Sequence, residues 1–475
     1  MRLQKLIMKN KSFKYQSISD LSKLIKNKTI SPVELTSYFL DKLESQGPDY
    51  NAVAHINRSS AINQAKKAES QIIKDQYLGT LHGIPFAAKD LLSTNDGSPT
   101  SWGAKPFINN IYNTESTVIS NLKNSGAILC AKTSMVEFAG GMGYQQPDAS
   151  AFGPGINPWN KSYWSGGSSS GSGSAVSAGL IPFAIGSETW GSILSPAANC
   201  GVTGLRPTFG IVSRYGSMVL SWTLDKIGPL ALSAKDSNII IKHMVGKDKK
   251  DEYSINNRFN SNIKIPANIK IGIPTNINKS MQDEVKKNFE STLKILQSKY
   301  QLVEIDLPDM PISAATRTIL LSEVSSAFEN VFDEKIQSQL NAKETHYSVL
   351  ATNTVLAKDY IKSLRIQNVT NKKMNDLFNN IDVIISPVKP TTASKIDENF
   401  RWATRKDFNE EHPTTLIGAI GNLIGLPAIS IPNGFDNKGL PTSFQIMSNK
   451  HKDDLIIKLA EFIQDNSDWH HKHPN

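Results

Sequence analysis

Cysteine is scarce in this sequence, with only Cys130 and Cys200 among 475 residues. Two cysteines cannot build the disulfide framework that stabilises small secreted domains. Each stands among apolar or small residues, as a buried thiol does, and we expect both to be reduced and buried. The composition therefore excludes a disulfide-dependent extracellular scaffold.

Long apolar runs are also missing. The positively charged N-terminal stretch is interrupted by polar residues 9–11 before it reaches the length of a secretory signal. The longest apolar segment, residues 416–432, is broken by Asn422 and Pro427 and is too short for a membrane-spanning helix. We expect no membrane span and a cytoplasmic location.

A localised basic face is absent, although the formal net charge is +9. Lysine is scattered along the chain together with many Asn and Ile residues. This indicates an amino-acid bias of the whole chain rather than a nucleic-acid site. The contents of 39% hydrophobic and 20% charged residues are typical of a globular enzyme. The histidines of "WHHKHP", residues 469–474, have no acidic or cysteine partners nearby, so we expect a solvated tail and no metal site.

Helix and strand signals alternate along the chain. Ser31, Pro32 and Glu34 form the capping box that opens a helix, and an apolar run at 81–92 predicts a buried strand that ends at Lys89. The same alternation continues in the segments that we assign as helix 115–126, strand 127–133, strand 269–274, a helix with Val285, Phe289, Leu293 and Leu296 on one face, strand 302–308 and strand 381–387. The sequence therefore predicts one α/β domain.

The stretch "SYWSGGSSSGSGSAVSAG", residues 162–179, has the composition of a flexible linker. The next residues, 180–210, contradict that interpretation, because they continue with apolar clusters and further glycines and carry no run of charges. A solvated tether rarely leads into a core. We expect the glycine–serine run to be buried.

The same region resembles a known pattern. Residues 166–197, "GGSSSGSGSAVSAGLIPFAIGSETWGSILSPA", are similar to the signature of the amidase-signature family, and "GIPFAAKD" at 83–90 matches the lysine motif of that family. The resemblance also covers 126–141, 204–216 and 421–435, so it spans nearly the whole chain.

The resemblance implies a single amidase-signature domain over residues 1–475, with a central mixed β-sheet covered by helices on both faces. Its signature core would occupy about 80–235 and 380–465. Helices at 17–75 would precede the core, and a mostly helical insertion would occupy about 310–380.

By the same resemblance, Ser192 is the nucleophile, Ser168 is a bridging serine on a cis peptide bond, and Lys89 is the base. The backbone around the oxyanion hole would be that of Thr189, Trp190, Gly191 and Ser192. Met135 matches a family position near the acyl pocket, where a core methionine is an equal alternative. Family members need no metal or organic cofactor, and none is expected here.

Physical reasoning from the residues agrees with this assignment. Amide cleavage needs an activated nucleophile, a proton donor for the leaving amine, and hydrogen-bond donors for the oxyanion. A lysine with an ordinary pKa of about 10.4 acts as a base only when burial lowers that pKa, and the apolar "IPFAA" before Lys89 provides such burial.

Two signature positions differ from the family pattern. Trp190 stands where the family usually has a small residue, and Leu194 stands where it usually has arginine. An indole beside the nucleophile is expected to reshape the acyl pocket. We therefore expect the substrate to be a small apolar or aromatic carboxylic acid amide, whose C–N bond is hydrolysed.

The alternative is the A subunit of a glutamyl-tRNA(Gln) or aspartyl-tRNA(Asn) amidotransferase, a glutaminase that releases ammonia within a complex on tRNA. Thr415 stands where that protein has an aspartate, 318–364 contains no arginine to bind glutamine, and "MVEF" at 135–138 replaces "MDEF". A stand-alone amidase is favoured, and nucleic acid is a partner only under the alternative. An inactive binding module is disfavoured because all three triad residues are present, and a homodimer stays open.

Overall fold

Eleven strands form one mixed sheet in the part of the chain that the structure describes. The structure is a computed structural model, and it describes residues 12–141, 146–256, 259–331, 333–342, 353–398 and 412–475. The order across the sheet is β1-β3-β2-β4-β6-β5-β10-β11-β9-β7-β8. The strands are β1 Val53–Ile56, β2 Pro85–Lys89, β3 Ile128–Thr133, β4 Phe183–Glu188, β5 Thr203–Arg206, β6 Lys226–Ala231, β7 Lys270–Pro274, β8 Gln301–Ile305, β9 Val383–Pro387, β10 Ala428–Phe435 and β11 Pro441–Ser448.

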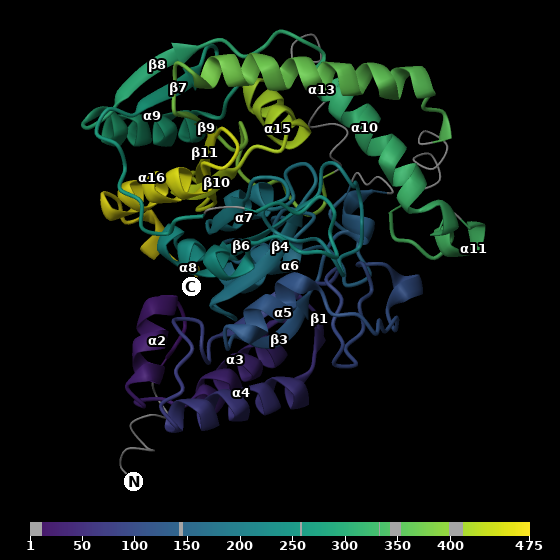
Figure 1. The fold of residues 1–475 in the computed structure, drawn as a ribbon, viewed down its shortest axis with the longest axis vertical. Coiled ribbons are helices and arrows are strands. Elements are labelled where there is room, and N and C mark those ends of the chain that lie inside the picture. The colour runs from purple at the N-terminus through teal and green to yellow at the C-terminus, as the bar shows by residue number, and fades with distance from the viewer. Residues whose placement is uncertain (1–11, 142–145, 257–258, 332, 343–352, 399–411) are drawn as a thin grey trace.

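Parallel and antiparallel pairs divide this sheet into regions. β2 is parallel to both β3 and β4, and β7 is parallel to both β8 and β9. The strands between these groups, β6, β5, β10 and β11, pair antiparallel. Figure 1 shows β7 and β8 at one end of the molecule and β1 and β3 toward the other.

Helices pack on both faces of the sheet. The α-helices are α2 Ile18–Lys26, α3 Pro32–Gln46, α4 Arg58–Ile73, α5 Thr117–Asn124, α6 Ser170–Ser177, α7 Leu194–Cys200, α8 Ala234–Met244, α9 Asp283–Gln297, α10 Ile312–Ala327, α11 Glu334–Gln337, α13 Ala357–Phe378, α15 Pro413–Leu423 and α16 Asp453–Asp465. Short 3₁₀ turns lie at η1 Pro48–Tyr50, η2 Lys105–Phe107, η3 Glu137–Gly140, η4 Glu329–Val331 and η5 Trp469–His471.

Two neighbouring residues of β5 show which helices lie on opposite faces. The hydroxyl of Thr203 accepts a hydrogen bond of 3.1 Å from Gln464 of α16. A side chain added at Gly204 would instead meet Ala197 of α7. Because successive residues of a strand point to opposite faces, α16 and α7 cover different sides of the sheet.

The glycine–serine run forms the helix α6, and all eight of its residues are buried. The small side chains let its backbone approach neighbouring segments closely. A Cβ at Gly171 would collide with the carbonyl oxygen of Ala52 and would lie 2.6 Å from the backbone nitrogen of Ser134. The segment is therefore part of the core and not a linker.

The described elements match most of the expectations from the sequence. The helix predicted from the Ser31 capping box is α3. There the Ser31 hydroxyl accepts a hydrogen bond from the N–H of Glu34, and the Glu34 carboxylate accepts one from the N–H of Ser31, both at 3.0 Å. The insertion predicted at 310–380 is helical in α10, α11 and α13, and residues 332 and 343–352 lie outside the described part. Both cysteines are buried and free.

One expectation was incomplete. The N-terminal region 17–75, predicted as helices alone, also contains β1, which pairs antiparallel with β3. The strand is short, and its residues, Val-Ala-His-Ile, do not show the alternation of apolar and polar residues that identifies a longer strand. The apolar segment 416–432 is divided between α15 and β10. No helix in the described residues is long and apolar enough to cross a bilayer.

Candidate active site

Lys89 is the last residue of β2, and its side chain is fully buried. Its Nζ atom is hydrogen-bonded to Oγ of Ser168 at 2.7 Å and to Oγ of Ser187 at 2.9 Å. β2 pairs with β4, and this pairing brings Ser187 to the end of β2. The lysine therefore lies inside the protein with serine hydroxyls around its amine.

Burial is the main influence on the ionisation of Lys89. It lowers the pKa of the amine from 10.5 to about 7, against the opposing charges of Asp225 and Glu188. Near neutral pH a substantial fraction of Lys89 is thus uncharged and able to accept a proton.

Ser168 lies in the turn that leads into α6. The Gly167–Ser168 peptide bond is cis, and the Ser168 side chain is 1% exposed. The carbonyl oxygen of Ser168 accepts a hydrogen bond of 3.1 Å from the backbone N–H of Val136, and the N–H of Ser169 donates to the carbonyl oxygen of Ser192 at 3.3 Å. These bonds join the segments around Ser168 and Ser192 directly.

Ser192 lies between β4 and α7, and it is 8% exposed. The residues after it are held by Glu188, whose Oε2 atom accepts hydrogen bonds from the N–H groups of Ile193 at 2.9 Å and Leu194 at 3.0 Å. The other oxygen of Glu188 accepts a hydrogen bond of 2.9 Å from Arg206. The Glu188–Arg206 pair is fully buried and fixes the turn that carries Ser192.

Electrostatics keep Glu188 charged in this position. Burial alone would raise its pKa, but the positive charges of Arg206 and Lys226 and the backbone hydrogen bond from Leu194 outweigh burial and lower the pKa to about 2. The carboxylate can therefore hold the first N–H groups of α7 as an anion.

The residues expected at the oxyanion hole lie immediately before Ser192. The backbone N–H groups of Trp190, Gly191 and Ser192 donate no hydrogen bond within the described residues. Gly191 has a φ of +86°, and a side chain there would meet open space. This segment thus presents unpaired donors beside Ser192, as stabilisation of an oxyanion requires.

Asp225 and Lys226 hold Thr189, the first residue of this segment. The hydroxyl of Thr189 donates to Asp225 at 2.6 Å, and Lys226 Nζ donates to the carbonyl oxygen of Thr189 at 3.3 Å and to Oδ1 of Asn422 at 2.7 Å. The carboxylate of Asp225 also accepts from the N–H groups of residues 220 and 221. Two buried ionisable side chains thus fix the segment that carries the donors.

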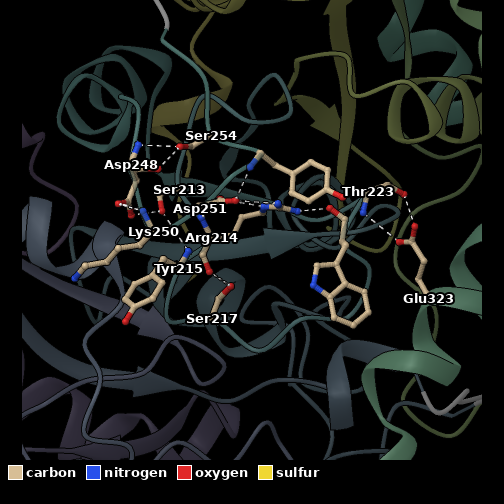
Figure 2. Close-up of polar contacts among 12 residues, drawn as sticks. Ser213, Arg214, Tyr215, Ser217, Thr223, Asp248, Lys250, Asp251, Ser254 and Glu323 are labelled. Carbon is tan, nitrogen blue, oxygen red and sulfur yellow. Dashed lines mark hydrogen bonds and ion pairs between the residues drawn. The ribbon is translucent and has the colours of Figure 1, made fainter.

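The loop at 213–225, which leads to Asp225, is held by side-chain hydrogen bonds at two places (Figure 2). Arg214 is bonded to the carboxylate of Asp251, with contacts of 3.2 and 3.3 Å. Figure 2 shows Glu323 at the other end of the loop, where it accepts hydrogen bonds from the N–H of Thr223 at 3.1 Å and from its hydroxyl at 2.7 Å. The support of the candidate site therefore extends to α10.

Met135 is fully buried next to this centre, since the following residue, Val136, is bonded to Ser168. Trp190 is partly exposed, and its indole lies between two further elements. The guanidinium carbon of Arg317, on α10, is 5.7 Å from its ring centroid, and a Cβ at Gly418 of α15 would be 3.5 Å from its Nε1 atom.

Several of these residues were not found from the sequence. Glu188, Arg206, Asp225 and Lys226 support the segment around Ser192, and Arg317 lies one position outside the range that contains no arginine. A signal was present for Glu188 and Arg206, because each is a charged residue in an otherwise apolar or small stretch, where a buried charge requires a partner.

The histidine tail does not form a metal site in the described residues, which contain no cluster of three or more His, Cys, Asp or Glu side chains suited to a metal. His473 instead stacks on Tyr15 with a distance of 3.8 Å between ring centroids. The expectation of a freely solvated tail was therefore too simple, because this part packs against the N-terminal region.

An α/β fold that holds a neutralisable lysine, two serines and unpaired backbone donors in one buried place has the groups that nucleophilic acyl transfer uses. The family model for amidases matches residues 34–457, and the chain belongs to this amidase-signature family.

Relatives and solved structures cover nearly the full chain. The A subunit of glutamyl-tRNA(Gln) amidotransferase from Legionella pneumophila, strain Philadelphia 1, is 32% identical over 493 residues, which cover 97% of this chain and 99% of that protein. The crystal structure of the corresponding protein from Thermotoga maritima is 28% identical, with a TM-score of 0.78 and 96% of each chain covered. Peptide amidase from Stenotrophomonas maltophilia has the same fold, with a TM-score of 0.81 at 23% identity, covering 95% of this chain and 97% of that one.

Proposed function

We propose that this protein is an amidase that hydrolyses the C–N bond of a small carboxylic acid amide through a serine acyl-enzyme. Ser192 is the nucleophile, Ser168 passes the proton, and Lys89 is the base. The observation that supports this most strongly is the 2.7 Å hydrogen bond between a fully buried lysine amine and Ser168. We propose a cytoplasmic location for this reaction.

The reaction proceeds in two halves. Neutral Lys89 takes the proton of Ser168 while Ser168 takes the proton of Ser192, and Ser192 Oγ bonds to the amide carbon. The N–H groups of Trp190 and Gly191 bind the oxyanion. When the C–N bond breaks, the proton returns from Lys89 through Ser168 to the leaving amine. Water then attacks the ester by the same proton route and releases the acid.

A second candidate is the A subunit of a tRNA-dependent amidotransferase, because the relative from Legionella pneumophila carries that name at 32% identity. The chemistry at the serine would be the same, with glutamine as the amide. Water would still release glutamate from the acyl-enzyme, and the ammonia would pass to an acceptor. Thr415, an exposed residue of α15, stands where that protein has an aspartate, and this difference favours the stand-alone amidase. Nucleic acid is a partner only under this second candidate.

The test is ammonia or arylamine release by the purified chain, incubated separately with glutamine, aliphatic primary amides and aryl amides. We expect turnover of simple amides by the isolated chain and its loss in Ser192→Ala, with both proteins folded. Wild-type turnover in Ser192→Ala would remove the assignment of the nucleophile. Glutaminase activity that depends on added partner subunits would instead support the second candidate.

A further inference from the structure

Lys226 is the first residue of β6, and sheet pairing places it beside the segment that precedes Ser192. It stands directly opposite Glu188 in the antiparallel pair of β4 and β6, so the two side chains point to the same face of the sheet. The side chain of Lys226 is buried, and its Nζ atom is 3.3 Å from the carbonyl oxygen of Thr189. A second buried lysine amine thus lies at the candidate site, in addition to Lys89.

The hydrogen-bond partners of Lys226 indicate that its amine is charged. Nζ donates to the carbonyl oxygens of Thr189 and Leu224 and, at 2.7 Å, to Oδ1 of Asn422. The amide of Asn422 is oriented by its Nδ2 atom, which donates to the carbonyl oxygen of Gly418 at 2.9 Å. All of these partners can only accept hydrogen bonds, and an ammonium has one N–H for each of them.

The environment of Lys89 differs in this respect. Its amine is bonded to the hydroxyls of Ser168 and Ser187, which can donate to the lone pair of a neutral amine. A neutral Lys226 would instead leave one buried acceptor without a donor and would direct its lone pair at an oxygen. The surroundings therefore suit Lys89 to the neutral form and Lys226 to the ammonium.

Charged groups on neighbouring segments set the ionisation of Lys226. Burial is the largest influence and lowers its pKa, and the charges of Arg206 and Arg214 act in the same direction. The carboxylates of Glu188 and Asp225 oppose this effect. Lys226 therefore loses its proton at a lower pH than an ordinary lysine, so its charge can be varied experimentally.

The bond to Thr189 connects this charge to the expected oxyanion hole. The carbonyl of Thr189 and the N–H of Trp190 belong to one planar peptide group with a delocalised C–N bond. A cation bonded to the oxygen draws electron density from the nitrogen, so the N–H at the other end becomes a stronger donor. That N–H donates no hydrogen bond within the described residues, and the proposed reaction uses it to bind the oxyanion.

We propose that Lys226 is a positioning residue whose ammonium acts through the Thr189–Trp190 peptide to strengthen binding of the oxyanion. The inference rests on the proposed function and deepens it, because it gives the two buried lysines separate roles. Lys89 must be neutral to accept a proton, whereas Lys226 must be charged. The reaction therefore needs one lysine in each form.

The experiment measures how fast a fluorophosphonate labels Ser192 between about pH 5 and about pH 10. In this reaction Ser192 Oγ bonds to phosphorus and fluoride leaves, so no amide substrate has to be known. The variants are Lys226→Gln, which keeps a donor without the charge, and Asn422→Asp, which places a carboxylate beside the amine. Lys389→Gln is the matched control, since burial also lowers the pKa of Lys389, to about 8, but its amine donates to Asn199 near the far end of α7.

We expect a bell-shaped profile in the wild type, with a rise as Lys89 loses its proton and a fall at higher pH as Lys226 loses its own. At the maximum, Lys226→Gln should be labelled about 10-fold more slowly, which is the difference between a charged and a neutral hydrogen bond. Its profile should lack the fall at high pH. Asn422→Asp should move that fall to higher pH, because a carboxylate favours the ammonium. Lys389→Gln should give the wild-type profile.

The shape of the profile separates this role from a structural one. If Lys226 only held the segment in place, Lys226→Gln would be labelled more slowly at every pH with the fall at high pH unchanged, and the proposal would be overturned. Urea unfolding shows whether each variant is folded. If Lys226→Gln does not fold, Asn422→Asp decides, and a fall that does not move to higher pH contradicts the proposal. Absence of labelling at Ser192 in the wild type contradicts the proposed function instead, and the inference with it.

Discussion

Replacing Lys89 with methionine tests whether the amine is uncharged in the folded protein. Methionine preserves much of the side-chain volume but cannot bind a proton. The folded-state pKa of Lys89 is about 7 and the unfolded value is about 10.5. Folding therefore favours release of the proton from Lys89, and a difference of one pKa unit between the two states is equivalent to about 1.4 kcal/mol. At pH 7 the lowered pKa of Lys89 therefore reduces the free energy of unfolding of the wild type by about 4 kcal/mol.

The sign of the pH dependence follows from proton binding. Between pH 7 and pH 10.5 the unfolded chain keeps a proton on Lys89 that the folded chain has lost. The contribution of Lys89 to the free energy of unfolding of the wild type therefore increases with pH in this interval. From pH 7 to pH 9 the increase is about 2 kcal/mol from this group. Below pH 7 both states bind the proton and the contribution becomes constant.

The measurement is urea unfolding of the wild type and of Lys89→Met at pH 7 and at pH 9. The lost hydrogen bonds to Ser168 and Ser187 change the variant by an amount that does not depend on pH, and other titrating groups cancel in the difference. We expect the stability of the wild type relative to the variant to improve by about 2 kcal/mol from pH 7 to pH 9. A difference that stays constant would mean that Lys89 is charged at rest, and the proposed base would be refuted.

Two further predictions concern the support of the site and of the fold. Glu188→Gln leaves Arg206 buried without its counter-ion, so urea unfolding should show a loss of about 3–5 kcal/mol in the free energy of unfolding, and covalent labelling of Ser192 by a fluorophosphonate should slow. Adding Arg206→Met should restore part of the stability. A double variant less stable than Glu188→Gln would contradict this account. Ser31→Ala removes one hydrogen bond of the capping box of α3 and should lower the free energy of unfolding by about 1 kcal/mol. Labelling of Ser192 should not change. An unchanged stability would show that the cap is dispensable.

The sequence predicted the α/β architecture because local signals were strong there. The apolar run before Lys89 gave β2 and its end point, and the capping box gave α3. The proposed roles of Ser168 and Ser192 came from a resemblance, since serines beside glycines are usually turn residues. β1 was missed because four half-buried residues carry too little pattern.

The remaining parts of the site depend on contacts between distant segments. Glu188 and Arg206 are on different strands, and Thr189 depends on a carboxylate 36 residues away. Arg317 comes from a helix outside the signature core and reaches Trp190 only in the folded chain. Spacing along a sequence does not encode such pairings. The isolated charges of Glu188 and Arg206 indicate that each needs a partner, but not which residue provides it.

The close fit of α6 against its neighbours has a consequence for how this sequence can vary. With the Ala52 carbonyl lying where a methyl group at Gly171 would be, substitution there is limited by space and not by chemistry. The restricted glycine and serine composition of α6 thus follows from close packing, and the segment resembles a flexible linker only in composition. A filter that discards low-complexity sequence would remove a buried segment in which space limits substitution.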